Sequence, residues 1–284
     1  MINSLVCLAL SGCLCPPYIL VDGREHRGTR SVILESCMNT FFFELCVESL
    51  KAAQAAERGG ADRIELCSRL EISGITPSKR LIAVTLQALS IPAQVLIRPR
   101  GGDFVYSTAE FAQMKEQVQW VRQAGAAGVA LGVLRADGRV DVERSRELVE
   151  LARPMKVTFH RAFDETSNLF EALEAIIKTG ADCLLTSGGA PDVLTGAGQI
   201  AQLVRLAGDR IQIMAGGGLR LDSMAEVLQC TGVRFLHGSL TRRVAKYGPM
   251  NCNRHTAVGK ADILETDVRS AVRLMRSHFA VEEN

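Results

Sequence analysis

The chain has 284 residues, of which 47% are hydrophobic and 23% charged, and its formal net charge is +2. The small net charge, the lack of long basic runs and the 5% aromatic content argue against nucleic-acid binding. No apolar run reaches the roughly 18 residues that a membrane-spanning helix needs, so we expect no membrane span.

The first part of the chain, residues 1–37, differs from the rest. Its apolar stretch LVCLALSGCLC is followed by Pro16-Pro17 and the polar run DGREHRGTRS. A secretory signal would contain such an apolar core, but the preceding residues MINS carry no Lys or Arg. We therefore predict that residues 1–37 are a poorly ordered N-terminal extension, with a cleaved signal as the alternative, and that residues 38–284 form the folded domain.

From Phe41 onward, short apolar strands alternate with amphipathic helices. The predicted strands are residues 41–47, 62–67, 94–98, 128–132, 156–160, 183–187, 211–215 and 234–237. The predicted helices are residues 49–58, 77–89, 108–124, 142–151, 169–178, 191–206, 221–229 and 262–279. Such regular βα units over about 240 residues predict a single (β/α)8 TIM barrel, an α/β fold, in preference to a doubly wound sheet.

Polar side chains gather where the predicted strands end, which is where TIM barrels place their active sites. These residues are Glu44, Cys46, Glu65, Cys67, Arg98, Arg100, Asp103, His160, Arg161, Asp164, Ser187 and His237, and the glycine turn at Gly217 lies among them. Each could be structural by itself, but burying several charges is costly unless they pair or bind a ligand. No strand carries Lys in its middle or at its end, which argues against a Schiff-base mechanism.

Two of these residues, Cys46 and Cys67, occur in the repeated strings FELCVES and IELCS. In each string a Glu and a Cys two positions apart share one face of a strand. Two thiolates on neighbouring strands could bind the soft ion Cu(I), whereas free Cys is otherwise a small buried hydrophobic residue. A two-coordinate ion would require sulfur atoms roughly 4–5 Å apart. The nine Cys are unevenly spaced, which indicates a reducing compartment rather than a disulfide framework.

The strings GGADRIELCS, IRPRGGDFVYS, VTFHRAFD, LTSGGAP and MAGGG are long and unusual. Together with FELCVES they resemble the CutC copper homeostasis family, from about Phe41 onward. The resemblance implies a TIM barrel, a cytoplasmic location and a homo-oligomer. It also implies Cu(I) binding, for which Cys46 and Cys67 are the corresponding residues.

A second hypothesis is an enzyme, because two thiols do not account for the charged residues at the strand ends. Glu44 or Glu65 would act as general base with His160 as partner acid, and Asp164 joins them as a candidate catalytic residue. Arg98 and Arg100 would orient an anion, as forked donors. The substrate-binding set would also contain Asp103, Arg161, Ser187, Gly217 and His237. The reaction would be that of a lyase, isomerase or epimerase on a small sugar acid or sugar phosphate, and a purely structural interior is a third possibility.

Overall fold

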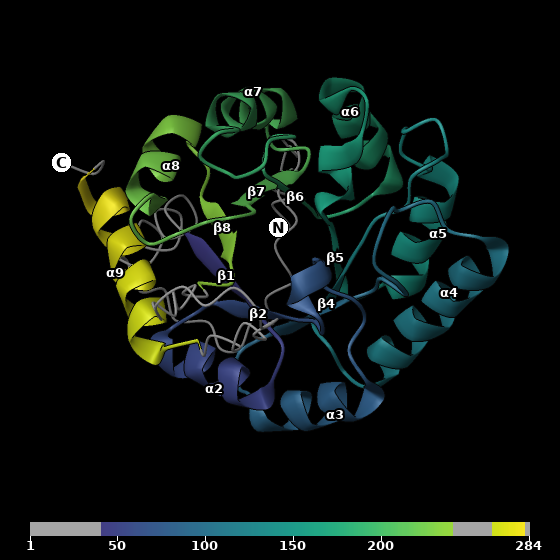
Figure 1. Cartoon of the computed structure of the whole chain (residues 1–284), viewed down its shortest axis with the longest axis horizontal. Helices are drawn as coiled ribbons and strands as arrows, with labels where there is room; N and C mark the ends of the chain where they lie inside the picture. The colour runs from purple at the N-terminus through teal and green to yellow at the C-terminus, as the bar shows by residue number, and fades with distance from the viewer. Residues whose placement is uncertain (1–40, 241–262, 282–284) are drawn as a thin grey trace, which may run out of the picture. The chain divides into compact units, whose positions relative to one another are not determined.

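The computed structural model describes residues 41–240 and 263–281, and the predicted extension at residues 1–37 lies outside them. Eight parallel strands pair in chain order, and β8 pairs with β1 to close the barrel (Figure 1). The strands are β1 (Phe42–Val47), β2 (Arg63–Leu66), β3 (Ala93–Leu96), β4 (Gly128–Leu131), β5 (Lys156–Phe159), β6 (Cys183–Thr186), β7 (Gln212–Gly216) and β8 (Phe235–Gly238). The predicted (β/α)8 TIM barrel is confirmed.

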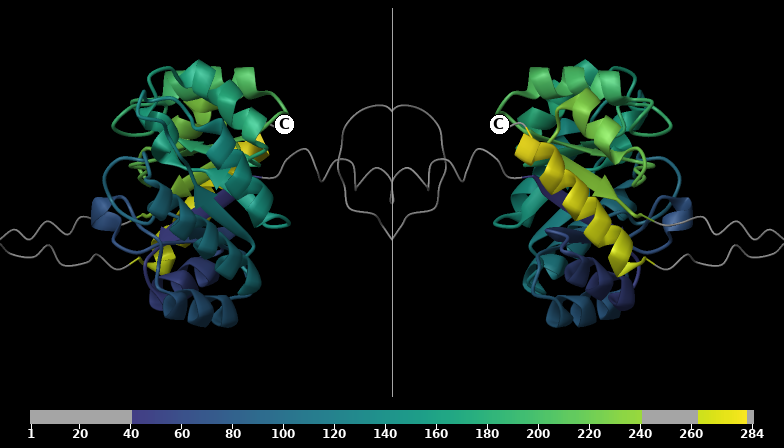
Figure 2. Two further views of the ribbon diagram at one scale, coloured as in Figure 1. Left: turned by 90° about the vertical axis from the view of Figure 1, so that its right-hand side faces the viewer. Right: turned by 90° about the vertical axis from the view of Figure 1, so that its left-hand side faces the viewer.

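The helices form a ring outside the strands (Figure 1). They are α2 (Leu50–Gly59), α3 (Lys79–Ala88), α4 (Thr108–Gln123), α5 (Val142–Ala152), α6 (Leu169–Thr179), α7 (Ala197–Ala207), α8 (Met224–Thr231) and α9 (Glu265–Val281). The last helix, α9, lies across the side of the barrel and closes the ring between α8 and α2 (Figures 1 and 2). A Cβ atom on Gly59 would lie 2.5 Å from the Val268 side chain, so α2 and α9 can approach closely only with glycine there. None of the described helices is both long and apolar enough to cross a membrane.

Local signals in the sequence explain where the helices begin and end. The Ser49 and Ser78 side chains accept hydrogen bonds from the first turns of α2 and α3. Ser107 and Glu110 form a reciprocal capping box at the start of α4. Gly60 follows α2 with a φ of 90°, the left-handed conformation that ends many helices.

The predicted start of α7 was wrong by several residues. The Asp192 side chain accepts hydrogen bonds from the backbone N–H groups of Leu194 and Thr195, which makes a turn instead of a helix. A Cβ atom on Gly196 would lie 1.8 Å from the Ser187 carbonyl oxygen. The chain therefore passes close to the end of β6 before α7 begins.

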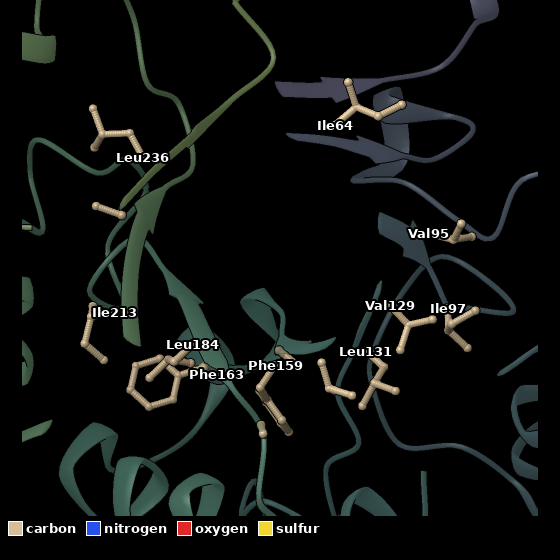
Figure 3. Packing of buried hydrophobic residues seen from close by; sticks show 14 of the residues in the cluster. Ile64, Val95, Ile97, Val129, Leu131, Phe159, Phe163, Leu184, Ile213 and Leu236 are labelled. Atoms are coloured by element: carbon tan, nitrogen blue, oxygen red, sulfur yellow. The ribbon is translucent and has the colours of Figure 1, made fainter. Parts of the chain in front are cut away.

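Side chains alternate between two environments along every strand. Outward residues from β2 round to β8 pack against the helices, and Figure 3 shows Ile64, Val95, Val129, Leu184 and Leu236 among them. The polar inward residues of β1 and β2 are Glu44, Cys46, Arg63 and Glu65, which occupy the barrel interior. The main apolar core thus lies between barrel and helices, while the interior holds polar groups beside two smaller apolar clusters.

Candidate functional site

A cavity of about 420 Å³ opens at the C-terminal ends of the strands. Its lining includes the polar residues Cys46, Glu65, Cys67, Arg98, His160, Arg161 and His237. Two short 3-10 helices, η1 (Leu70–Ile72) and η2 (Arg161–Glu165), supply further lining residues. The volume is that of a pocket for a small molecule.

The two thiols predicted to act together do meet in this cavity. Strand register pairs Cys46 with Glu65, so Cys67 lies farther along its strand than the matching sequence strings indicate. The Sγ atoms of Cys46 and Cys67 nevertheless lie 3.4 Å apart, and both residues are buried. The hydrogen bond to Cys67 and burial together raise the pKa of the Cys46 thiol well above its ordinary value.

Beside the thiols, Glu44 joins two cations in the barrel interior. The Nε atom of Arg63 donates to Glu44 Oε2 at 2.5 Å, and His237 Nδ1 lies 2.8 Å from Glu44 Oε1. Burial alone would raise the pKa of Glu44, but Arg63 and His237 outweigh it and hold the pKa below its ordinary value. Burial likewise opposes a charged His237, yet Cys46, Glu44 and Glu65 raise the pKa of His237 well above its ordinary value.

The other acid, Glu65, lies next to this group without a strong partner. Its Oε2 atom is 3.7 Å from His237 Nδ1. Burial raises the pKa of Glu65 to about 7, despite the opposing effect of His237. One ligand atom each from Cys46, Glu65 and His237 lie within 4.8 Å of one another, so these residues could hold a metal ion.

The buried His160 is neutral in this environment. Its Nδ1 atom accepts a hydrogen bond from the Ala162 N–H at 3.2 Å, which leaves the proton on Nε2. Burial and the nearby Arg98 lower the pKa of His160 to about 3. Gly132 makes room for the ring, since a Cβ atom there would lie 2.8 Å from Nδ1. His160 can therefore donate its Nε2 hydrogen in a hydrogen bond near neutral pH, but it is not the imidazolium that a general acid of this kind requires.

The guanidinium of Arg98 is occupied by the protein itself. It donates to the carbonyl oxygens of Ile72 and Gly74 at 2.9 and 2.8 Å and to that of Gly102 at 2.6 Å. Its Cζ atom lies 4.7 Å from the centre of the Phe104 ring. Arg98 thus joins the loops that follow β2 and β3, and only part of it lines the cavity.

The predicted pair Arg100 and Asp103 lies in the loop after β3, away from the cavity lining. Arg100 donates to Asp103 Oδ1 at 2.9 Å and to Glu110 Oε1 at 2.6 Å. The hydrogen bond from Arg100 holds the pKa of Asp103 below its ordinary value. The two residues fold the loop onto α4, and neither contacts the thiols.

Arg161 and Asp164 lie in η2, which follows β5, and they form an ion pair at the cavity mouth. Arg161 Nε donates to Asp164 Oδ2 at 2.8 Å, and Arg161 Nη2 donates to Ser187 Oγ at 2.9 Å. Gly217 lies under the guanidinium, since a Cβ atom there would be 2.8 Å from Arg161 Cζ. The structure thus brings Arg161, Asp164, Ser187 and Gly217 together at one place.

Sequence reasoning missed Arg63, which neutralises Glu44 from within the barrel. The signal was present, because Arg63 lies two residues before Glu65 and so shares its inward face.

The model of the CutC family matches residues 41–242. The chain belongs to the CutC family. A CutC family protein of Mesorhizobium japonicum is 46% identical over 194 residues, which cover 68% of this chain and 75% of that protein. The human copper homeostasis protein cutC homolog is 43% identical over 201 residues, covering 71% of this chain and 74% of the human one.

Solved structures agree with this assignment. The crystal structure of a candidate copper homeostasis protein CutC from Streptococcus agalactiae superposes with a TM-score of 0.68 at 30% identity, covering 71% of this chain and all of that one (100%). Thiamine phosphate pyrophosphorylase from Pyrococcus furiosus superposes with a TM-score of 0.53 at 18% identity, covering 84% of this chain and 98% of that one. The second likeness concerns the barrel fold alone.

Proposed function

We propose that this CutC family member binds Cu(I) through the thiolates of Cys46 and Cys67 and serves copper homeostasis. The observation that carries the proposal is the pair of Sγ atoms 3.4 Å apart at the cavity wall. Thiolates are the soft ligands that Cu(I) prefers. Copper homeostasis in the names of the human and mouse relatives points the same way.

The donor set fits a three-coordinate ion better than a linear one. With metal–sulfur bonds of about 2.3 Å, a linear ion needs sulfur atoms about 4.6 Å apart and a trigonal ion about 4.0 Å. The observed 3.4 Å separation is closer to the trigonal value. His237, whose ligand atom lies within 4.8 Å of that of Cys46, would supply the third donor. Cu(I) would displace the thiol protons and the added proton of His237, because ligands to a metal must be deprotonated.

The test is a titration of the reduced protein with Cu(I) against a competing chelator. We expect Cys46→Ser combined with Cys67→Ser to weaken binding by more than about hundredfold, since even residues that only orient ligands change metal affinity by about 10- to 100-fold. Cys183→Ser is the matched control, because Cys183 is buried in the same barrel but packs in a separate cluster with Leu185 and Met214. An unchanged affinity in the double variant rejects the proposal.

A second candidate function is an enzyme on a small anionic substrate. The observation that favours it is the cavity of about 420 Å³, which is far larger than a single ion needs. Glu65 would act as general base and His237, held by Glu44, as its acid partner. This assignment differs from the sequence-based one, in which Glu44 was an alternative base and His160 the acid. Proton transfer of this kind is common to isomerases, epimerases and many lyases.

A thermal-shift screen with a library of small phosphorylated and carboxylated metabolites tests the enzyme. The wild-type protein should convert compounds that stabilise it into product. Glu65→Gln should not, because glutamine has the size of glutamate but cannot act as the general base. If no compound raises the melting temperature of the wild-type protein, the enzyme hypothesis loses its support.

We further propose that the protein acts in the cytoplasm as a homo-oligomer. The four cysteines in the described part of the chain, Cys46, Cys67, Cys183 and Cys230, are free, which suits a reducing compartment. Cell fractionation and size-exclusion chromatography with light scattering test the two statements separately. Recovery of the protein in an oxidising compartment contradicts the cytoplasmic location. A monomeric mass contradicts the homo-oligomer.

A further inference from the structure

We propose that the side of the cavity formed by the ends of β5, β6 and β7 is a subsite for the phosphate group of a small phosphate monoester. The subsite consists of the Arg161 guanidinium and the turn at Gly217 and Gly218. It goes beyond copper binding and rests on the second candidate function, for which it names the substrate class.

The guanidinium of Arg161 is held in place by two hydrogen bonds and keeps N–H groups that can donate to a ligand. Nε is bound by Asp164 and Nη2 by Ser187, at 2.8 and 2.9 Å. Within residues 41–240 and 263–281, no acceptor takes up Nη1, and the side chain is 39% exposed at the cavity mouth. A fixed guanidinium with a free edge suits a planar, forked contact with phosphate oxygens.

The carboxylate of Asp164 does not prevent Arg161 from binding an anion, because both carboxylate oxygens already accept hydrogen bonds from other groups. Besides Arg161, it accepts from Thr186 Oγ1, from the Ser187 N–H and from the Gly189 N–H, at 2.5, 3.0 and 3.0 Å. These hydrogen bonds spread the negative charge of Asp164 over the donors of the loop after β6. Asp164 therefore orients Arg161 and leaves the cation to face the cavity.

The turn after β7 places backbone donors beside the guanidinium. Gly217 and Gly218 have φ values of 106° and 70°, which side chains rarely adopt. Their N–H groups donate to no acceptor among the described residues, and both glycines line the cavity. Successive backbone N–H groups in such turns bind anions, and TIM barrels often bind phosphate at the loops after strands 7 and 8.

The rest of the cavity defines the remainder of the ligand. In a closed barrel of eight strands, β2 lies opposite β6, so Glu65 faces the subsite across the cavity. A phosphate held at Arg161 would leave its organic part between the apolar Leu185 and Leu219 and the polar group around Glu65. A phosphate monoester of a small polyol has this combination of one charged end and a polar body.

Calorimetric titration of the reduced, metal-free protein with glycerol 3-phosphate and with inorganic phosphate tests the subsite. We expect saturable binding of both, tighter for the ester, and a loss of about 10- to 100-fold in Arg161→Gln, as expected for one charge-assisted contact. Arg58→Gln is the matched control, because Arg58 is an exposed arginine on α2 paired with Glu265. Absence of saturable binding by wild type, or equal binding by Arg161→Gln, overturns the proposal.

Two more variants keep the test decisive. If Arg161→Gln does not fold, Arg161→Lys keeps the charge but loses the fork, and should bind the ester measurably more weakly than wild type; equal binding contradicts the subsite. The Cys46→Ser, Cys67→Ser double variant should retain phosphate binding after losing Cu(I) binding. If the wild-type protein binds Cu(I) but not the ester, only the subsite proposal is contradicted. If it binds the ester but not Cu(I), only the copper proposal is contradicted.

Discussion

The outward and inward faces of β1 are both largely buried, yet they differ in chemistry. Phe43, Leu45 and Val47 point outward into the apolar core, while Glu44 and Cys46 alternate with them and point inward. The outward face needs only volume and shape, because dispersion and the hydrophobic effect have no direction. The inward face needs named partners, because a buried charge is stable only when it is paired and hydrogen-bonded.

This difference separates stability from function within single strands. Outward residues could be exchanged for others of similar size with small effects. The inward Glu44, by contrast, is bound by one arginine and one histidine. Replacing any of these three residues therefore changes the charge inside the barrel. Four changes, from the largest expected effect to the smallest, test how far this separation extends.

Phe43→Ala should have the largest effect on stability. Phe43 is fully buried on the outward face, and removing such a ring lowers the free energy of unfolding by about 3–5 kcal/mol. Urea unfolding measures the loss, and the Cu(I) affinity of the folded variant should equal that of wild type. Phe170→Ala, at an exposed position on α6, is the control and should change stability by about 0.5 kcal/mol or less. Similar losses in both variants would contradict the outward core as described.

Arg63→Met should lower the free energy of unfolding by about 3 kcal/mol, because it leaves Glu44 buried with only His237 as partner. The same change at the exposed Arg58, whose partner is Glu265, should cost about 1 kcal/mol or less. Adding Glu44→Gln to Arg63→Met should recover part of the loss. Equal losses at the two arginines would show that the interior pair is no more demanding than a surface pair.

Glu65→Gln should change the pH dependence of stability. The folded-state pKa of Glu65 is about 7, above its ordinary 4.5, so its contribution is complete below the ordinary pKa and is lost as pH rises toward 7. Wild type should therefore lose up to about 3 kcal/mol relative to Glu65→Gln over that range, because the pKa differs by about 2.5 units (7 − 4.5) at about 1.4 kcal/mol per unit. Urea unfolding at several pH values measures it. Parallel profiles for the two proteins would contradict the raised pKa.

Arg100→Gln should have the smallest effect. Its ion pairs with Asp103 and Glu110 lie in a partly exposed loop, so the loss of stability should be about 1 kcal/mol or less. Because Arg100 does not line the cavity, binding of Cu(I) and of glycerol 3-phosphate should match wild type. Weaker binding of the phosphate ester by this variant would place Arg100 in the site after all.

Sequence reasoning succeeded where a pattern repeats and failed where one residue has several possible partners. The strands were placed to within one or two residues, because alternating apolar residues and helix-ending glycines recur in every βα unit. Arg98 and Arg100 looked alike in the string IRPRGGDF, yet one is buried among loop carbonyls and the other lies outside the cavity. Those partners come from loops that no local pattern describes.

The sequence by itself determined the barrel, the face that Glu and Cys share on each of the first two strands, and most of the polar residues at the strand ends. Period-two alternation and the repeated βα unit are local properties, so they can be read without a structure. Only the tertiary structure decided that Cys46 pairs with Glu65 in register while its sulfur meets that of Cys67. It also decided that His237 binds Glu44 and that Arg161 rests on Gly217. These contacts join residues from distant strands, and their distances depend on how the closed barrel staggers its strands.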